Sequence, residues 1–406
     1  MKFQEKWEHV QLGSVCTKIG SGATPRGGDS VYLNEGTAII RSQNVYNGFF
    51  DWNGLAYITE EHAEKLKGVT VKSRDVLLNI TGDSVARCCQ VPDTVLPSRV
   101  NQHVAIVRPN PEIILPEFLC FYLISPQMQK YLLSRAGSGG TRNALTKNMI
   151  EGFFVPKPSV VVQRAIVKNL SAYDDLIENN RRRIQLLEEF ARLLYKEWFV
   201  HLRFPGHEHV KITDGVPEGW KKECLGNLCR EVRDSISPKE LEPQTPYIGL
   251  EHMPRRSISI SEWGYAEQVV SSKHRFRQGY ILFGKIRPYF HKVGIALVDG
   301  VASSDAIVIR VNEENLLPIT LMTVSSDAFV AVTSQTMKEG SKMPRADWKQ
   351  MRQYPMLLPQ ESLLGLFNSV ISPILEQLKS LSLANKKLGV ARDLFLPRLM
   401  NGEIVV

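Results

Sequence analysis

The sequence predicts an α+β protein in which two similar mixed α/β domains alternate with two long helices that pair as an antiparallel coiled coil. Three observations support this prediction. A stretch in mid-chain places apolar residues at alternating intervals of four and three, which is the spacing of a coiled-coil seam. The patterns that precede this stretch recur after it, and a second stretch of the same kind follows near the end. With 406 residues, the chain is long enough to form two domains and their cores.

Composition and charge place the chain among ordinary globular proteins. Hydrophobic residues make up 43% of the sequence and charged residues 23%, as is usual for soluble domains. The net charge of +8 fits a polyanionic partner, although many proteins without such a partner are equally basic. The 6 cysteines form no Cys-x-x-Cys pair and indicate reduced thiols. Because no apolar run approaches about 18 residues and the N-terminus lacks an apolar signal region, we expect a soluble, cytoplasmic protein.

The first domain is expected over residues 1–158, where apolar runs alternate with turn residues. The expected strands are residues 38–40, 76–80 and 104–107. Residues 20–25 (GSGATP) are expected to form a loop, and a helical pattern runs from residue 115 to 133. Pro156 is expected to end the last strand and to lead into the first long helix.

The first long helix is expected over residues 159–203. Its seam consists of Ile166, Leu170, Tyr173, Ile177, Asn180, Ile184, Leu187, Ala191, Leu194 and Trp198. Only Asn180 is clearly polar among them, so the apolar stripe is narrow and suits packing on a partner helix. At 1.5 Å per residue the seam would be about 50 Å long, which is typical of a spacer between domains.

The second half of the chain repeats the first. The expected segments are a linker (204–217), a second domain (218–360) and a second long helix (361–402). Trp220 repeats the context of Trp7, and residues 356–359 answer residues 153–156 at an offset of 203. Adding 201 to each seam position gives Phe367, Ile371, Ile374, Leu378, Leu381, Asn385, Leu388, Arg392, Phe395 and Leu399. The sequence therefore predicts an internal duplication with two units.

The two seams are expected to pack on each other, because each exposes a stripe that needs burial. Duplicated halves tend to be related by a pseudo-two-fold axis, which would make the helices antiparallel. Placing Asn180 opposite Asn385 sets the whole register, since a slip would leave each buried amide without a partner. The expected pairs are Ile166 with Leu399, Leu170 with Phe395, Tyr173 with Arg392, Ile177 with Leu388 and Ile184 with Leu381. The alternative is that each asparagine hydrogen-bonds water at an exposed end of the seam.

Three arrangements that could suggest catalysis or metal binding are better explained as structure. They are residues 279–285 with Ile286; His201, His207 and His209; and Ser303, Asp305 and His291. The first has the G-x4-G-K spacing of a phosphate loop but lacks the Ser or Thr that binds Mg²⁺, and its interior YILF is typical of a strand. The histidines lack acidic or cysteine partners at ligand spacing, and the serine lacks the glycines of a nucleophile elbow. We therefore expect no catalytic residue, metal or cofactor.

Basic and amide residues gather at turns of both domains, and such side chains can read base edges or clamp phosphates. In the first domain the candidates are Arg41, Gln43, Asn44, Thr81, Arg87, Arg99, Asn101, Gln102, Arg142 and Lys147. In the second they are Lys285, Arg287, Tyr289, His291, Lys292, Lys342, Arg345 and Lys349. Any one of them could be a solvated surface residue, but their recurrence in both halves favours a nucleic-acid interface. A rod with a domain at each end would suit two half-sites about one helical turn, roughly 34 Å, apart.

With this organisation, the chain resembles the specificity subunit of Type I restriction–modification systems over nearly its whole length. The resemblance is carried by the domain–helix–domain–helix order and by residues 19–25 (IGSGATP), 191–200 (ARLLYKEWFV), 284–289 (GKIRPY) and 392–404 (RDLFLPRLMNGEI). It implies a non-enzymatic protein whose two globular domains are target recognition domains, each of which reads one half of a bipartite DNA target. The long helices would set the number of unread base pairs between the halves.

The resemblance also implies protein partners. Two copies of a modification subunit, which carries the methyl donor and methylates adenine, would dock on the helices. Two restriction subunits can join and supply ATP-driven translocation and cleavage. Two rival functions remain: a stand-alone NTPase or nucleic-acid hydrolase, and a coiled-coil scaffold or decoy that binds modification subunits without reading DNA.

Overall fold

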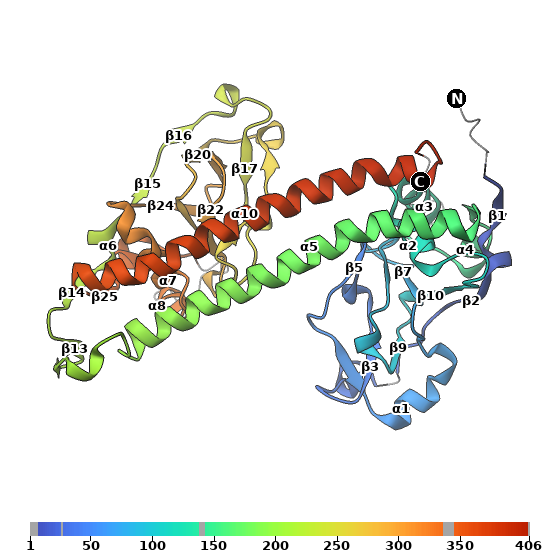
Figure 1. Ribbon diagram of the computed structural model, residues 1–406, viewed down its shortest axis with the longest axis horizontal. Helices are drawn as coiled ribbons and strands as arrows, with labels where there is room; N and C mark the ends of the chain where they lie inside the picture. Colours follow the sequence, from blue (N-terminus) through green and yellow to red (C-terminus); the bar gives the residue numbers. More distant parts are fainter. Residues whose placement is uncertain (1–6, 26, 138–142, 336–344, 405–406) are drawn as a thin grey trace. The chain divides into compact units, whose positions relative to one another are not determined.

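The computed structural model describes residues 7–25, 27–137, 143–335 and 345–404 (Figure 1). The chain forms two compact units, each of which contains a mixed α/β domain and parts of two long helices. Unit 1 consists of Met1–Asp175 and Gly389–Val406, and unit 2 consists of Leu176–Leu388.

Unit 1 is built on two sheets. The larger sheet is antiparallel, with the order β2 (Cys16–Ser21), β10 (Val104–Pro109), β7 (Val76–Asn79) and β8 (Cys88–Gln90). The smaller sheet has the order β6 (Ala56–Ile58), β3 (Thr37–Ile40) and β9 (Ser98–Val100), with β3 parallel to β9. The strands expected from the apolar runs are therefore confirmed as β3, β7 and β10. Every residue of β3 and β7 is buried, which explains why these runs are continuous rather than alternating.

Short elements complete the domain of unit 1. The paired strands are β1 (His9–Gln11) with β11 (Phe154–Pro156), and β4 (Val45–Tyr46) with β5 (Phe49–Phe50). The helices are α1 (Glu60–Lys65), α2 (Pro116–Ile124), α3 (Pro126–Gly137) and α4 (Lys147–Glu151). The main core includes one face of the larger sheet and the buried residues of α2, among them Phe118 and Leu119.

The helical pattern expected from residue 115 to 133 is in fact two helices, α2 and α3. The break falls at Ser125, which precedes Pro126 and has an extended backbone with φ −60° and ψ 144°. A residue before proline is driven out of the helical region by the proline ring, so the pattern of apolar residues continues while the helix does not.

The expected loop at residues 20–25 also begins differently, because β2 continues to Ser21 and Gly20 pairs with Ile106. Beyond the strand, Gly22 passes so close to Val100 that an added Cβ would lie 1.9 Å from its carbonyl oxygen. This close approach explains the glycine in the segment better than a need for loop flexibility does.

Unit 2 has the same strand orders as unit 1, with additions. Its first sheet has the order β15 (Cys229–Val232), β24 (Ala306–Val311), β21 (Ile281–Gly284), β22 (Val293–Ala296) and β18 (Ser259–Ile260). Its second sheet has the order β16 (Ser235–Ile236), β20 (Lys273–Phe276), β23 (Gly300–Ala302), β17 (Pro246–Ile248) and β19 (Gly264–Tyr265). The first four strands of the first sheet match β2-β10-β7-β8, and β19-β17-β23 matches β6-β3-β9. The edge strand β18 has no counterpart among the described strands of unit 1.

The remaining elements of unit 2 are short. The paired strands are β12 (Ile212–Thr213) with β13 (Val216–Pro217), and β14 (Lys221–Cys224) with β25 (Pro355–Leu358). The helices are α6 (Leu225–Leu228), α7 (Leu317–Val324), α8 (Asp327–Gln335) and α9 (Trp348–Met351). In the described part of the chain, no single helix is long and apolar enough to cross a membrane, and only the bent pair Glu314–Val324 and Asp327–Gln335 passes that test jointly.

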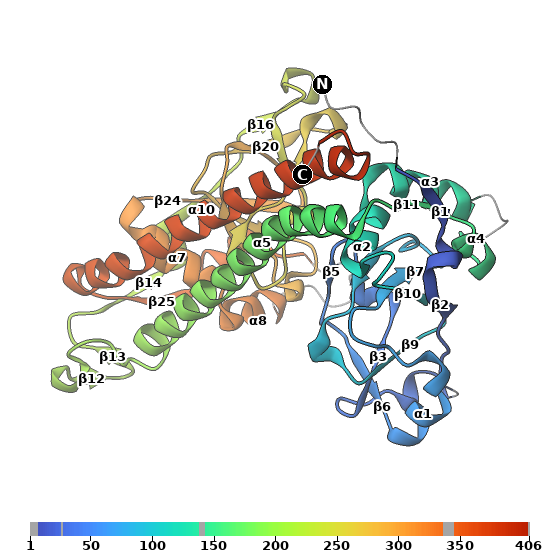
Figure 2. The same ribbon diagram turned by 45° about the vertical axis from the view of Figure 1, so that its right-hand side comes forward.

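The long helices are α5 (Val160–Tyr195), continued by the π-helical turn Lys196–Val200, and α10 (Glu361–Met400). Figures 1 and 2 draw α5 in green and α10 in red. In unit 2 the two helices run antiparallel. Asn180 bonds Asn385, while Trp198, in the π-helical turn that continues α5, packs on Phe367 near the start of α10. The seam residues Ile166, Leu170, Ile177, Ala191, Phe367, Ile371 and Leu378 are buried.

In unit 1 the two helices also contact each other. Arg392 Nη1 lies 2.7 Å from Asp174 Oδ1, and the rings of Tyr173 and Phe395 are 6.2 Å apart. Arg392 thus pairs with Asp174, next to its expected partner Tyr173, and also with Asp393. The ring of Tyr173 instead lies near Phe395, whose expected partner is Leu170.

Candidate nucleic-acid interface

The polar residues that follow β7 in unit 1 meet those that precede β10. Ile80 N–H donates to the carbonyl of His103 at 2.9 Å, and Leu145 N–H donates to the carbonyl of Ile80 at 2.8 Å. Thr81 Oγ1 lies 2.6 Å from Nδ1 of His103, whose Nε2 lies 3.3 Å from the amide nitrogen of the exposed Gln102. We call residues 80–82, 101–103 and 143–145, which converge here, the unit 1 corner.

The loop after β3 joins the same corner. Asn101 N–H donates to the carbonyl of Ile40 at 3.0 Å, and Asn79 Nδ2 donates to the carbonyl of Ser42 at 2.8 Å. These bonds bring Arg41 and Gln43, both of which donate to the carbonyl of Gly54, to the edge of the unit 1 corner. Four segments that are far apart in sequence therefore present polar groups at one end of the larger sheet.

Unit 2 builds an equivalent corner with the same backbone bonds. Lys285 N–H donates to the carbonyl of Asp305 at 2.7 Å, and Ala346 N–H donates to the carbonyl of Lys285 at 2.8 Å. Ser303 N–H donates to the carbonyl of Ile248, as Asn101 does to that of Ile40. We call residues 285–287, 303–305 and 345–346 the unit 2 corner.

The unit 2 corner is more basic than the unit 1 corner. Lys285 Nζ donates to the carbonyl of Ser304 at 3.0 Å, and Arg345 Nη2 lies 3.8 Å from Asp305 Oδ1. The side chain of Arg345 is 60% exposed, so its ion pair with Asp305 leaves it open to a second anion. This combination of basic groups on an exposed rim is what phosphate binding requires.

A strained loop follows the unit 2 corner. Arg287 and His291 have left-handed backbones with φ of 50° and 55°, and the short 3-10 turn Pro288–Phe290 lies between them. Such conformations are uncommon for residues other than glycine and are often found at functional sites. The exposed ring of Tyr289 stacks edge-on against Phe290 at 5.0 Å.

Two arginines surround that loop. The guanidinium carbon of Arg287 lies 5.8 Å from the ring centroid of Phe290, and that of Arg255 lies 4.3 Å from it. Sequence reasoning missed Arg255, because it lies in a polar run after a turn and the ring that it covers is 35 residues away in the chain. The loop therefore combines cationic and aromatic groups, which suit contacts with nucleic-acid backbone and bases.

Several candidate residues use their polar groups within the fold, among them Asn44, Asn101, Arg99 and His291. Asn44 is fully buried: its Nδ2 donates to the carbonyl of Asp51 at 2.9 Å, and its Oδ1 accepts from the N–H of Arg41. Asn101 is buried and its Oδ1 accepts from the N–H of His103, while Arg99 donates to the carbonyl of Ala63. His291 is 5% exposed, and its Nε2 lies 2.6 Å from the carbonyl oxygen of Ser325. These groups shape the loops and point into the protein.

The pKa values of two residues in the second domain agree with this burial. Burial lowers the pKa of His291, although the carbonyl of Ser325 acts in the opposite direction. Burial also lowers the pKa of Lys292, whose ammonium donates to the carbonyl of Leu250 at 2.5 Å. Both residues support the loop that carries Arg287 and Tyr289.

The other candidates lie on exposed or partly exposed positions outside the two corners. Arg87 stacks over the ring of Tyr46 at 4.5 Å, Lys147 lies 3.5 Å from Glu151, and Lys349 is exposed at the start of α9. Arg142 and Lys342 lie outside the described residues.

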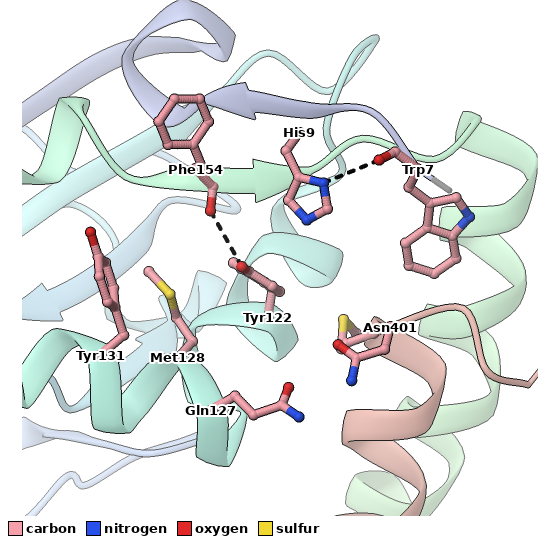
Figure 3. A pocket seen from close by; sticks show the side chains of 9 residues that line it. Trp7, His9, Tyr122, Gln127, Met128, Tyr131, Phe154 and Asn401 are labelled. Atoms are coloured by element: carbon pink, nitrogen blue, oxygen red, sulfur yellow. Dashed lines mark hydrogen bonds between the residues drawn. The ribbon is translucent and has the colours of Figure 1, made fainter. Parts of the chain in front are cut away.

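A pocket of about 810 Å³ lies elsewhere in unit 1 (Figure 3). Its lining residues are Trp7, His9, Tyr122, Gln127, Met128, Tyr131, Phe154, Met400 and Asn401. None of them has a carboxylate or a thiol, and most of the lining side chains are aromatic, amide or thioether groups. Figure 3 shows that Tyr122 and His9 already bond backbone carbonyls, those of Phe154 and Trp7.

Burial keeps the thiols of four of the six cysteines protonated. Burial raises the pKa of Cys16 and of Cys229 to about 12, and it also raises the pKa values of Cys88 and Cys89. Thiols that stay protonated are poor nucleophiles. Among the described residues, no group of three or more His, Cys, Asp or Glu side chains could hold a metal ion.

Comparisons with known proteins agree on one family. Residues 4–189 match the model described as "Type I restriction modification DNA specificity domain". The MjaIX specificity subunit of Methanocaldococcus jannaschii, a Type I restriction enzyme subunit, is 23% identical over 76% of this chain and 74% of its own length. The corresponding HindI subunit of Haemophilus influenzae is 20% identical over 98% of this chain and 99% of its own length.

The fold is also similar to a solved structure. A Type I restriction–modification S subunit from M. genitalium has a TM-score of 0.60 and 13% sequence identity, with 98% of each chain covered. At this identity the likeness concerns the fold alone, which is mixed α/β with long helices.

Proposed function

We propose that this chain belongs to the family of Type I restriction–modification specificity subunits, because residues 4–189 match the specificity-domain model and two such subunits match most of the chain. In this proposal it is the non-catalytic subunit that selects the DNA sequence on which such a complex acts. Its two globular domains, residues 1–158 and 218–360, are target recognition domains, and each reads one half of a bipartite target. The observation that carries this proposal is the pair of corners, in which the same backbone bonds hold exposed polar side chains in both units.

The proposed reading surface in each domain consists of the exposed and partly exposed polar groups at its corner. In the first domain these are Arg41, Gln43, Thr81 and Gln102. In the second they are Lys285, Arg287, Tyr289 and Arg345, to which we add Arg255. Amides and guanidinium groups suit base edges, and the lysine and exposed arginines suit phosphates.

The long helices, in segments 159–203 and 361–402 with the linker 204–217 between the two halves, act as a spacer. We propose that they form an antiparallel coiled coil and that the two halves of the chain are an internal duplication with a pseudo-two-fold axis. The register is set by one amide pair: Asn180 Nδ2 donates to Asn385 Oδ1 at 2.9 Å, and Asn385 Nδ2 donates to the carbonyl of Ile177 at 3.3 Å. A slip of one helix would break both bonds in a half-buried seam.

The partners that we propose are two modification subunits, which two restriction subunits can join. On α5 in unit 2, Leu186, Phe190 and Leu193 are 57%, 50% and 55% exposed, although the other face of the helix is already buried against α10. Their intervals of four and three form a second apolar stripe, which suits a helix from another chain. Val390 and Leu394 are similarly exposed on α10 in unit 1.

The decisive experiment is co-expression of this chain with its modification subunit, followed by sequencing of the methylated bases in the host DNA. We expect one bipartite motif, methylated on both strands. The purified complex should also bind a duplex with that motif, with an affinity that falls steeply as salt rises because phosphate contacts release counterions. Methylation without a shared motif, or binding without sequence preference, would overturn the proposal.

A second function is supported by the apolar stripe on α5 alone. A scaffold or decoy that binds modification subunits would need that stripe but would not need the corners. A band-shift assay of DNA binding by the complex with the modification subunit separates the two functions. If this chain is only a scaffold, the complex will show no preference for any DNA sequence.

A further inference from the structure

In unit 2, a short segment at the edge of the first sheet is attached to both long helices. It comprises residues 256–263 and includes the edge strand β18, which pairs only with β22 among the described strands. We call it the bracket segment. Polar and charged side chains attach it to α5 and α10. Unlike apolar packing alone, such contacts form only when the segment lies at a specific position on the helices.

The main contact with α5 is made by the carboxylate of Glu188, a residue that is 5% exposed. Its Oε1 accepts from the hydroxyl of Ser257 at 2.7 Å and from that of Ser259 at 3.0 Å. The same oxygen accepts from the backbone N–H groups of Ile258 and Ser259, at 3.0 and 3.2 Å. A buried carboxylate with four donors around it has one well-defined position, because any shift leaves buried polar groups unpaired.

Two more contacts complete the attachment. One turn along α5, Arg192 Nη2 donates to the carbonyl of Arg256 at 2.7 Å. On α10, Lys386 Nζ lies 3.1 Å from the ring centroid of Trp263, at the far end of the bracket segment. Lys386 directly follows Asn385, so the contact to α10 is adjacent to the amide pair that joins the two helices.

The first domain is held to its helix in a different way. In unit 1, Gln163 of α5 is fully buried, and its Oε1 accepts from the N–H of Leu115 at 2.7 Å. The residue of α10 that corresponds to Glu188 by the offset of 201 is Gly389, which has no side chain. The attachment through a buried carboxylate therefore belongs to unit 2 only, within the described residues.

We propose that Glu188 is a positioning residue that fixes the second recognition domain at one height and rotation on the helix pair, and so fixes the number of unread base pairs in the target. This inference rests on the proposed function. Two residues of α-helix rise about 3 Å, and one base pair of DNA occupies about 3.4 Å. A slip of only two helix residues would thus move the reading surface by nearly one base pair.

The test uses the complex of this chain with its modification subunit and the motif found by sequencing methylated bases. Binding is measured to duplexes whose two half-sites are separated by the native gap, one base pair fewer and one more. For the unaltered chain we expect a preference of about 10- to 100-fold for the native gap, the range of a mismatched base pair. Glu188→Ala should reduce that preference to less than about threefold, while base changes in either half-site remain as harmful as before.

The matched control is Glu189→Ala, which removes the exposed neighbouring carboxylate and should keep the full preference. Glu188→Gln retains an acceptor oxygen and should keep most of the preference. Lys386→Met removes the cation over Trp263 but keeps the length of the side chain, and it should also reduce the preference for the native gap. This variant provides an independent test if Glu188→Ala does not fold.

The outcomes are distinguishable. If the unaltered complex has no bipartite preference, the proposed function itself fails. If it has one and neither Glu188→Ala nor Lys386→Met weakens the preference for the native gap, the inference is refuted. Loss of all sequence preference at the second half-site in both folded variants would equally refute it, since the residues would then shape the reading surface rather than position the domain.

Discussion

Replacing Asn180 by leucine should destabilise unit 2 by about 1–3 kcal/mol, the usual cost of leaving a buried polar partner unsatisfied. Asn385 would lose the donor that lies 2.9 Å from its Oδ1 and would keep only its weaker 3.3 Å bond to the carbonyl of Ile177. In the double variant Asn180→Leu/Asn385→Leu, no amide is left unpaired and two leucines pack in the seam. Its stability should therefore return to that of the unaltered chain or exceed it.

The assay is a double-mutant cycle on the first urea-unfolding transition, followed by circular dichroism at the helix signal. The expected coupling between the two sites is about 1–2 kcal/mol, within the range for residues in direct contact. Asn179→Leu, at the exposed neighbouring position, is the matched control and should change stability by less than about 0.5 kcal/mol. Additive effects of the two single changes would refute the register, because unpaired sites do not couple.

Three further predictions follow from the same structure. Arg287→Ala should weaken discrimination at one half-site about 10- to 100-fold and Gln102→Ala should do so only at the other, as measured by binding to duplexes with single base changes; equal losses at both half-sites would refute the assignment of one half-site to each domain. Burial lowers the pKa of His291, so below about pH 6.5 the unfolded chain binds a proton that the folded chain does not, and stability should fall with acidification. Thermal unfolding at pH 7.5 and 5.5 should show that acidification lowers the stability of His291→Gln less than that of the exposed control variant His209→Gln. An equal fall in stability in both variants would contradict this account. Insertion of one heptad into both helices, within residues 176–187 and 378–389, should lengthen the gap in the methylated motif by about three base pairs, since seven residues rise about 10 Å. An unchanged gap would show that the helices do not measure it.

Much of the fold could be predicted because its signals are local. The seam over Ile166, Leu170 and Ile177 is an interval pattern, and the strands β7 and β10 are continuous apolar runs bounded by turn residues. The end of α2 before Ser125 could also have been predicted, since a proline follows that residue. A single helix was expected there instead, because the apolar pattern continues past the proline. The extension of β2 to Ser21 was not readable, because its pairing partner β10 lies more than 80 residues away in the chain.

The sequence by itself determined which residue types gather at which turns, but only the tertiary structure decided which of them face outward. Gln43 is exposed while the adjacent Asn44 is fully buried, and the exposed Tyr289 is two residues from the buried His291. In each pair the two residues lie in nearly the same stretch of sequence. The buried residue differs by its hydrogen-bond partner, which is Asp51 for Asn44 and Ser325 for His291, and neither partner is adjacent in the chain. The periodicity of the helices can therefore be predicted from the sequence, whereas the direction of a loop side chain depends on hydrogen bonds to residues elsewhere in the chain.

Glu188 is the clearest example of that division. In the sequence it is one of two consecutive glutamates on a helix, and nothing distinguishes it from Glu189. In the structure it accepts four hydrogen bonds from a segment about 70 residues further along, while its neighbour remains exposed. A helix dictates only that the two side chains point in different directions; which of them meets the domain depends on how the edge strand β18 packs against α5.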